Sequence, residues 1–205
     1  MSNLGIVEIN ALDVTRDDES DLLKAGFSIF NAFNPHSTVI PWNRSNGVTS
    51  AISSPGESSF PIFGLGSHFL LDGNLEIKGS RDIAMFGRLG SSYGSRAETI
   101  SILESLLDIG AKVSTTPVEE ILEMSLAEKF ELQSQDIIAL GRVVNNGLPF
   151  VLETNRAVDI LQALALKEKY SLNLVLVSVE EAPMVIEQLK VSKTPVIIDP
   201  MDNIP

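Results

Sequence analysis

Apolar and polar positions alternate in blocks through the last part of the chain, from Gly147 to Pro200. Continuous apolar runs occur at 148–152, 172–177 and 194–198. Between them lie two segments, 156–170 and 182–191, in which apolar residues recur every three or four positions. Continuous apolar runs are typical of strands that are buried on both faces, and the spacing between them is typical of amphipathic helices. The pattern therefore predicts a βαβαβ arrangement with a parallel sheet.

The chain before Gly147 adds further elements to this sheet. The pattern predicts helices over 38–45, 97–109, 114–133 and 134–145, and strands over 48–52 and 83–86. The third helix has a strong start signal in Thr116-Pro117, because proline is favoured in the first turn. Glycine, proline and serine are dense around residues 60–80, where alternating apolar positions flank Asp72-Gly73. This stretch predicts a small β-hairpin that lies over one end of the sheet.

Polar side chains follow each of the three late strands. In parallel sheets ligands bind at the carboxyl ends of the strands, so these side chains are the candidate ligand-binding residues. They are Glu153, Asn155, Arg156, Glu180, Glu181 and Asp199. The carboxylates suit either a hard cation or the start of a following helix, and helix capping is the favoured interpretation. Arg156 suits either an ion pair with Asp159 or the binding of an anion.

Bulk composition limits the partners and the location of the protein. The chain has 205 residues with 27 acidic and 15 basic side chains, a net charge of -12, which disfavours nucleic acid and anionic membranes. No apolar run is long enough to cross a bilayer, and the first residues show no signal peptide. We expect one domain over residues 1–205 and a cytoplasmic location. We also expect no disulfide, since the chain has no cysteine.

Several segments together resemble a known family. The late pieces are PFVLETNRAVDI (149–160), LNLVLVSVEEA (172–182) and TPVIIDP (194–200). Earlier pieces are LGIVEIN (4–10), FNPHSTVIP (33–41), RSNGVTS (44–50) and GSRAE (94–98). In their order they resemble the barrel units of amidohydrolases related to imidazolonepropionase, and the set covers most of the chain.

The resemblance implies a TIM-barrel fold and zinc or another divalent metal at the strand ends. The family holds this metal with a His-x-His pair, histidines after the fifth and sixth strands and an aspartate after the eighth. This chain has two histidines, His36 and His68, and neither falls at a matching position. Glu153 and Asn155 stand after one of those strands, and Ser178, Val179 and Glu180 stand after the other. We therefore expect no bound metal and no cofactor.

Together these observations predict an α/β fold, an incomplete TIM-barrel-like and mainly parallel sheet of about six strands with surrounding helices. By the family's count the first and eighth strands are missing, so the sheet is open at one seam, and we expect a homo-dimer to hide it. The first functional hypothesis is an amidohydrolase-like domain that has lost metal-dependent hydrolysis and acts as a binding or structural module, or is a truncated derivative of a larger enzyme. The second is a metal-dependent hydrolase of C–N bonds whose site a partner chain completes. The third is an open α/β ligand-binding domain unrelated to barrels, which a reversal of strand order would support.

Overall fold

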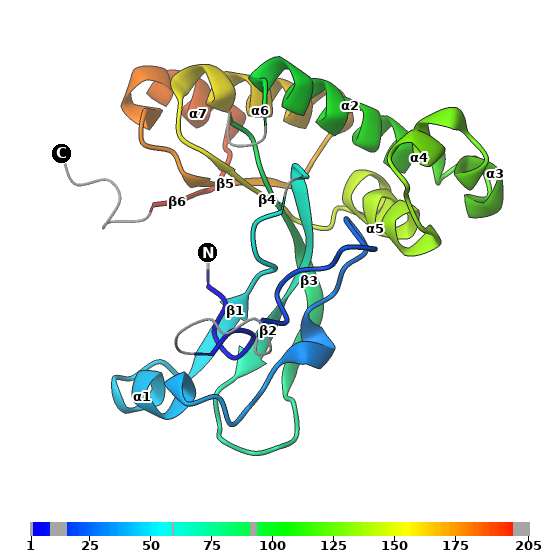
Figure 1. Ribbon diagram of the computed structural model, residues 1–205. Helices are drawn as coiled ribbons and strands as arrows, with labels where there is room; N and C mark the ends of the chain where they lie inside the picture. The colour runs from blue at the N-terminus through cyan, green and yellow to red at the C-terminus, as the bar shows by residue number, and fades with distance from the viewer. Residues whose placement is uncertain (1, 9–15, 59, 91–93, 199–205) are drawn as a thin grey trace.

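The computed structural model describes residues 2–8, 16–58, 60–90 and 94–198 (Figure 1). The strands are β1 (Ser50–Ser53), β2 (Ile62–Leu70), β3 (Gly79–Arg88), β4 (Phe150–Thr154), β5 (Leu174–Ser178) and β6 (Val196–Ile197). The helices are α1 (Val39–Ser45), α2 (Arg96–Lys112), α3 (Val118–Leu122), α4 (Ser125–Lys129), α5 (Ser134–Asn145), α6 (Ala157–Tyr170) and α7 (Ile186–Ser192). Two short 3-10 helices are η2 (Phe30–Ala32) and η3 (Ala182–Val185).

The six strands form one sheet in chain order, β1-β2-β3-β4-β5-β6. The pairs β1–β2 and β2–β3 are antiparallel, and β3, β4, β5 and β6 pair in parallel. The prediction of an incomplete barrel with about six strands is thus confirmed. The strand order does not reverse within the sheet, so the arrangement gives no support to an unrelated open α/β domain.

The predicted hairpin is present but is larger than expected. Its strands β2 and β3 are the second and third strands of the sheet itself and do not lie over one end of it. β3 lies between two neighbours: Gly79 to Gly87 pair with β2 on one side, and Met85 to Arg88 pair in parallel with β4 on the other. The strand predicted at 83–86 is therefore the second half of the hairpin, which brings Arg88 to the carboxyl edge of the parallel strands.

One predicted helix is divided in two. The segment 114–133 holds α3 and α4, because Met124 between them has an extended backbone with φ -73° and ψ 136°. Pro117 has an extended backbone with ψ 147° and precedes the first helical residue, one position earlier than the favoured place for proline. The other helices and strands lie within a few residues of the predicted ranges.

The main hydrophobic core lies between the sheet and the helices α2, α5 and α6 (Figure 1). Leu152 and Leu176 of the central strands point into this core, together with Leu106 of α2 and Ile160 of α6. The opposite face of the same strands carries a smaller cluster that includes Phe86, Val151 and Val177. Because side chains alternate along a strand, Arg88 and Glu153 follow this smaller cluster on the same face.

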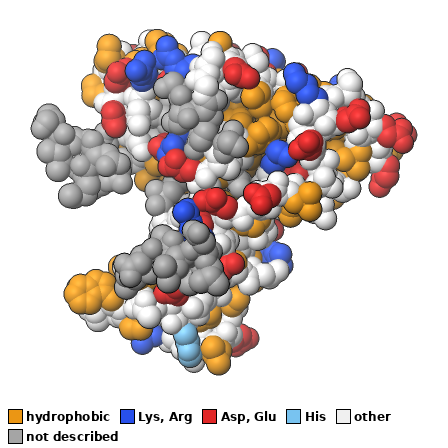
Figure 2. Space-filling view, viewed as in Figure 1, with side chains coloured by type: hydrophobic (Ala, Val, Ile, Leu, Met, Phe, Trp, Pro, Cys, Tyr) orange, Lys and Arg blue, Asp and Glu red, His pale blue; other side chains and the backbone are white. Residues whose placement is uncertain are grey.

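Charged side chains of both signs lie along the waist of the molecule, between the helical layer and the end that carries β1 and α1 (Figure 2). Acidic side chains also gather at the end formed by α3 and α4 (Figure 2). None of the helices within the described residues is long and apolar enough to span a membrane.

Candidate functional site

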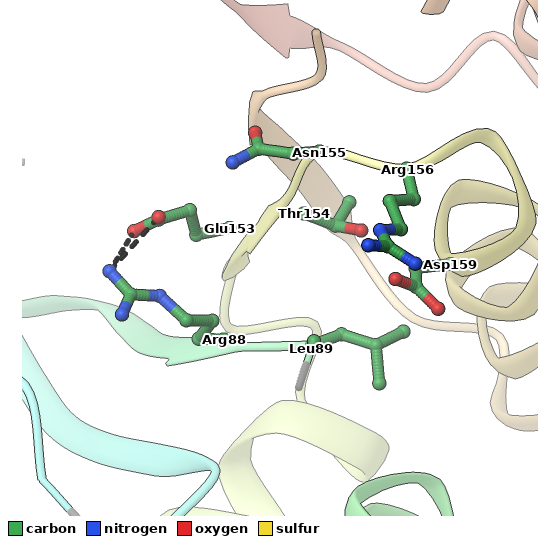
Figure 3. A pocket seen from close by; sticks show the side chains of 8 residues that line it. Arg88, Leu89, Glu153, Thr154, Asn155, Arg156 and Asp159 are labelled. Atoms are coloured by element: carbon green, nitrogen blue, oxygen red, sulfur yellow. Dashed lines mark hydrogen bonds and ion pairs between the residues drawn. The ribbon is translucent and has the colours of Figure 1, made fainter. Parts of the chain in front are cut away.

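Arg88 and Glu153 meet at the carboxyl ends of β3 and β4. They are register partners across the parallel pair, and Arg88 Nη2 donates to Glu153 Oε2 over 3.0 Å (Figure 3). The same guanidinium donates two hydrogen bonds to Glu57, which lies just after β1. One arginine therefore joins a carboxylate that lies between β1 and β2 to a carboxylate at the end of β4. This arrangement occupies the rim where barrel enzymes bind their ligands.

The Arg88 side chain is only 16% exposed. Burial lowers the pKa of the Arg88 guanidinium, but its hydrogen bonds to Glu57 and Glu153 outweigh burial and raise this pKa overall. The guanidinium stays charged at every pH at which the protein is folded. Glu153 thus has a permanent cationic partner, and its oxygens are held by a protein donor.

A pocket of about 320 Å³ opens beside this ion pair. It is lined by Arg88, Leu89, Gly90, Glu153, Thr154, Asn155, Arg156 and Asp159 (Figure 3). Three of the candidate residues, Glu153, Asn155 and Arg156, therefore line one pocket at the end of β4. Two polar oxygens there, Thr154 Oγ1 and Asn155 Oδ1, are buried and have no hydrogen-bond partner. A small molecule with hydrogen-bonding groups would satisfy them.

The first turn of α6 forms one side of the pocket. Asp159 is 4% exposed, and its Oδ1 lies 3.7 Å from Arg96 Nη1 at the start of α2. Of the two roles expected for Arg156, the ion pair with Asp159 is not found within the described residues, and Arg96 pairs with Asp159. Arg156 is exposed, and its guanidinium makes no ion pair with any described residue.

Glu181 caps a helix, but not the one that follows it. Its Oε2 accepts a hydrogen bond of 2.8 Å from the Ala157 N–H group, the first of α6. The Glu181 N–H group in turn donates to the Asn155 backbone oxygen over 2.9 Å. These two bonds tie the end of β5 to the start of α6. Glu181 therefore caps the neighbouring helix α6, and the prediction that it caps the helix after it is wrong, because η3 has no side-chain cap.

Glu180 and the two histidines do not line the pocket. Glu180 is exposed and borders a separate, mainly apolar groove between α7 and β6. Asp199 falls outside the described residues. His36 is exposed and precedes α1, and His68 lies within β2, where it pairs with Ile52 and Ser80.

The sequence did not single out Arg88, Glu57 or the Arg96–Asp159 pair. Arg88 lies in a glycine- and serine-rich stretch that resembles a loop, and it reaches the rim because the last residues of β3 pair in parallel with β4. Glu57 and Arg88 are 31 positions apart, and no local pattern reports such a contact. Thr154 was visible as a residue just after a buried run, but its missing hydrogen bond is a property of the packed structure alone.

The fold is that of part of an amidohydrolase. The chain matches the crystal structure of an amidohydrolase from Thermotoga maritima MSB8 with a TM-score of 0.76 and 22% sequence identity. The match covers 97% of this chain and 55% of that chain, so this chain spans about half of the matched protein. No protein-family model and no curated protein matches the sequence. The predicted amidohydrolase-like fold is confirmed, while the particular relation to imidazolonepropionase stays a prediction.

The side chains on the rim do not fit the divalent metal that this fold family implies. Within the described ranges, no three His, Cys, Asp or Glu side chains lie close enough together to hold a metal ion. Glu153, the carboxylate best placed on the rim, already accepts hydrogen bonds from Arg88. A guanidinium beside a carboxylate opposes the approach of a cation. The donor set therefore suits a polar organic ligand better than a metal.

Proposed function

We propose that this chain is an amidohydrolase-like domain that binds a small polar molecule and has lost metal-dependent hydrolysis of C–N bonds. The ion pair between Arg88 and Glu153 carries this proposal. It places a permanent positive charge at the carboxyl ends of the parallel strands, where metal-dependent barrel enzymes keep their cation. In this proposal the rim keeps a site for a small molecule but has lost the side chains that would hold a metal and so activate a water molecule.

The chemistry of metal-dependent hydrolysis supports this view. A bound divalent metal generates a nucleophile by lowering the pKa of its water, and it needs neutral imidazoles or free carboxylates in fixed positions. Both histidines of the chain lie away from the pocket. The two most buried carboxylates beside it, Glu153 and Asp159, are each paired with an arginine. Neither carboxylate among the described lining residues is thus available to hold a metal without first losing its own cation.

The pocket itself supports a binding role. Its volume of about 320 Å³ is at the lower end of the range for small-molecule sites. Buried polar atoms without partners are costly in a native protein, and a ligand that supplies hydrogen bonds removes the cost. Thr154 Oγ1 and Asn155 Oδ1 are two such atoms within one pocket.

Metal analysis together with an activity assay tests the proposal. The purified chain is incubated with zinc, manganese or iron, freed of excess metal and measured for bound metal, and amides and cyclic amidines are offered as substrates. We expect less than stoichiometric metal and no hydrolysis above background. One equivalent of tightly bound metal with turnover that Glu153→Gln abolishes would overturn the proposal.

A second candidate function rests on the length of the match. This chain covers 55% of the Thermotoga maritima amidohydrolase, so the rest of such a barrel could come from another polypeptide. In that case a partner chain would complete the site of a hydrolase that acts on C–N bonds other than peptide bonds. Co-purification of a stoichiometric partner from the native source, with metal and activity in the complex only, would favour this candidate. For both candidates we propose a cytoplasmic location, which fractionation of cells tests directly.

A further inference from the structure

The Thr154 hydroxyl is a buried polar group that the fold leaves without a partner. Thr154 is 1% exposed, and its Oγ1 accepts and donates no hydrogen bond. The side chain lines the pocket, with its hydroxyl directed toward Arg156 and Asp159 (Figure 3). A hydroxyl offers one donor hydrogen and two acceptor lone pairs. A ligand group at this place therefore gains a hydrogen bond that the ligand-free protein cannot make.

Arg156 supplies a positive charge at the same place. It stands at the N-terminal boundary of α6, a helix of 14 residues, and its guanidinium lies over the pocket (Figure 3). The first N–H groups of a helix have no partners within the helix, and the helix dipole favours an anion near them. Glu181 already demonstrates this preference, since its carboxylate accepts a hydrogen bond from the Ala157 N–H group.

The charges around the pocket limit the anion to a single negative charge. Glu153 is paired with Arg88, and Asp159 is paired with Arg96, which leaves Arg156 as the cation without an ion pair among the described lining residues. The carboxylates of Glu153, Asp159 and Glu181 all lie around the pocket or at the start of α6, and they repel a dianion more strongly than a monoanion. A carboxylate therefore suits the site better than a phosphate.

We propose that the ligand of this pocket is a small carboxylate, held between the Arg156 guanidinium and the Thr154 hydroxyl at the start of α6. This inference rests on the proposed binding function and adds the chemical class of the ligand. A planar guanidinium and a hydroxyl donor together match the two oxygens of a carboxylate. The volume of the pocket leaves room for a short carbon chain beyond the carboxylate.

A titration of the full chain with sodium propionate tests the proposal. The titration is monitored by 15N–1H NMR at constant ionic strength. We expect saturable shifts for the backbone amides of residues 154–160, and weaker binding of inorganic phosphate and of the neutral 1-propanol. Arg156→Gln should weaken propionate binding about tenfold, as expected for loss of a hydrogen bond to a charged group. Lys112→Gln removes a charge at the far end of α2 and should leave binding unchanged.

A second variant separates binding from folding. Thr154→Val replaces an unpartnered buried hydroxyl with a methyl group of the same shape, so the ligand-free protein should be as stable as the wild type or more stable. Propionate binding should nevertheless fall severalfold, and Thr154→Ser should retain it. Equal propionate binding by the wild type, Arg156→Gln and Thr154→Val would overturn the carboxylate assignment. Tighter binding of phosphate than of propionate would overturn it as well. Saturable binding of 1-propanol or propylammonium in place of propionate would overturn it too, while leaving the binding function itself intact.

Discussion

Arg88 and Glu153 stand opposite each other in the register of β3 and β4, and Arg88 Nη2 lies 3.0 Å from both carboxylate oxygens of Glu153. Their side chains are 16% and 18% exposed, so solvent screens the pair only partly. Because β3 also pairs with β2, the same guanidinium reaches Glu57 beyond β1. The ion pair thus joins the antiparallel and parallel parts of the sheet.

The first prediction concerns the stability that this pair contributes. Arg88→Met removes the only cation that pairs with Glu153 among the described residues and leaves that carboxylate mostly buried without its charge partner. We expect the free energy of unfolding to fall by about 2 kcal/mol, the range for hydrogen bonds to charged groups at a partly screened site. Urea unfolding followed by circular dichroism measures this difference.

The matched control is a solvated ion pair elsewhere on the same chain. Lys190 and Glu187 are paired over 2.8 Å, but their side chains are 63% and 74% exposed. Lys190→Gln should change the free energy of unfolding by less than about 0.5 kcal/mol, because exposed pairs contribute little. Equal effects of Arg88→Met and Lys190→Gln would show that the rim pair is no more than a surface contact.

The second prediction concerns Asp136, a carboxylate that joins two distant segments. Asp136 is fully buried in the first turn of α5, and its Oδ1 accepts hydrogen bonds of 2.8 Å from the N–H groups of Lys24 and Gly26. Its Oδ2 accepts another of 2.8 Å from the Gln133 N–H group. Asp136→Ala would leave these three donors without their acceptor, so we expect a loss of about 3 kcal/mol in the free energy of unfolding.

Two further variants make the test of Asp136 specific. Asp136→Asn keeps one acceptor oxygen and should lose roughly half as much stability. Glu120→Ala removes an exposed carboxylate from the first turn of α3 and should cost less than about 1 kcal/mol. Denaturant unfolding of the three variants should give this order, and an Asp136→Ala protein as stable as Glu120→Ala would contradict it.

The third prediction is a titration in the turn between β2 and β3. Hydrogen bonds from the Asn74 backbone, and then from the Lys78 side chain, lower the pKa of Asp72 to about 2. The folded-state pKa lies below the unfolded value of about 4, so Asp72 stabilises the fold above that pH. This contribution is lost as the pH falls from about 4 toward 2.

Carbon-13 NMR of the Asp72 carboxyl group across this pH range measures the pKa directly. Lys78→Met should raise the Asp72 pKa without restoring its ordinary value, since the backbone hydrogen bond from Asn74 is the larger cause and remains. A charge-removing variant away from this turn, Lys112→Gln, should leave the Asp72 pKa unchanged. An Asp72 pKa near 4 in the wild type would disprove the prediction.

The late part of the fold could be predicted because each of its strands and helices has a distinct apolar pattern within its own segment. Strands β4 and β5 are buried on both faces and appear as continuous apolar runs, and α6 between them has a clear apolar face. Glu153 lies near the carboxyl end of β4, and Asn155 and Arg156 follow the strand directly, so their common pocket agrees with the connectivity of a parallel sheet.

Contacts between residues far apart in the sequence could not be predicted from local sequence patterns. The Arg96 that pairs with Asp159 lies 63 positions before it, and nothing near either residue indicates the contact. β3 pairs with β2 along most of its length and also with β4 over its last residues, and its apolar pattern names neither neighbour. Such contacts depend on which segments meet in the folded protein, and the periodicity of a single segment gives no information about its partner.

The last prediction concerns the open side of the sheet. β6 is the final strand in the sheet order, and apolar side chains around it are well exposed: Val191 by 83%, Ile197 by 54% and Ile198 by 62%. An edge strand with exposed apolar neighbours favours association, and two-fold dimers are the commonest closed solution. We therefore propose a homo-dimer that buries this edge, with a single dimeric mass in light scattering of the purified chain.

Charge substitution at this edge tests the dimer without disturbing the core. Val191→Lys combined with Ile197→Lys places two like charges from each copy against the same pair on its partner, so the mass should fall to that of a monomer. The circular dichroism spectrum should not change, because both side chains are exposed. Leu75→Lys, a control at an equally exposed leucine in the turn between β2 and β3, should leave the dimer intact. A wild-type chain that stays monomeric at micromolar concentration would contradict the dimer. A dimer that only Leu75→Lys disrupts would place the interface away from β6.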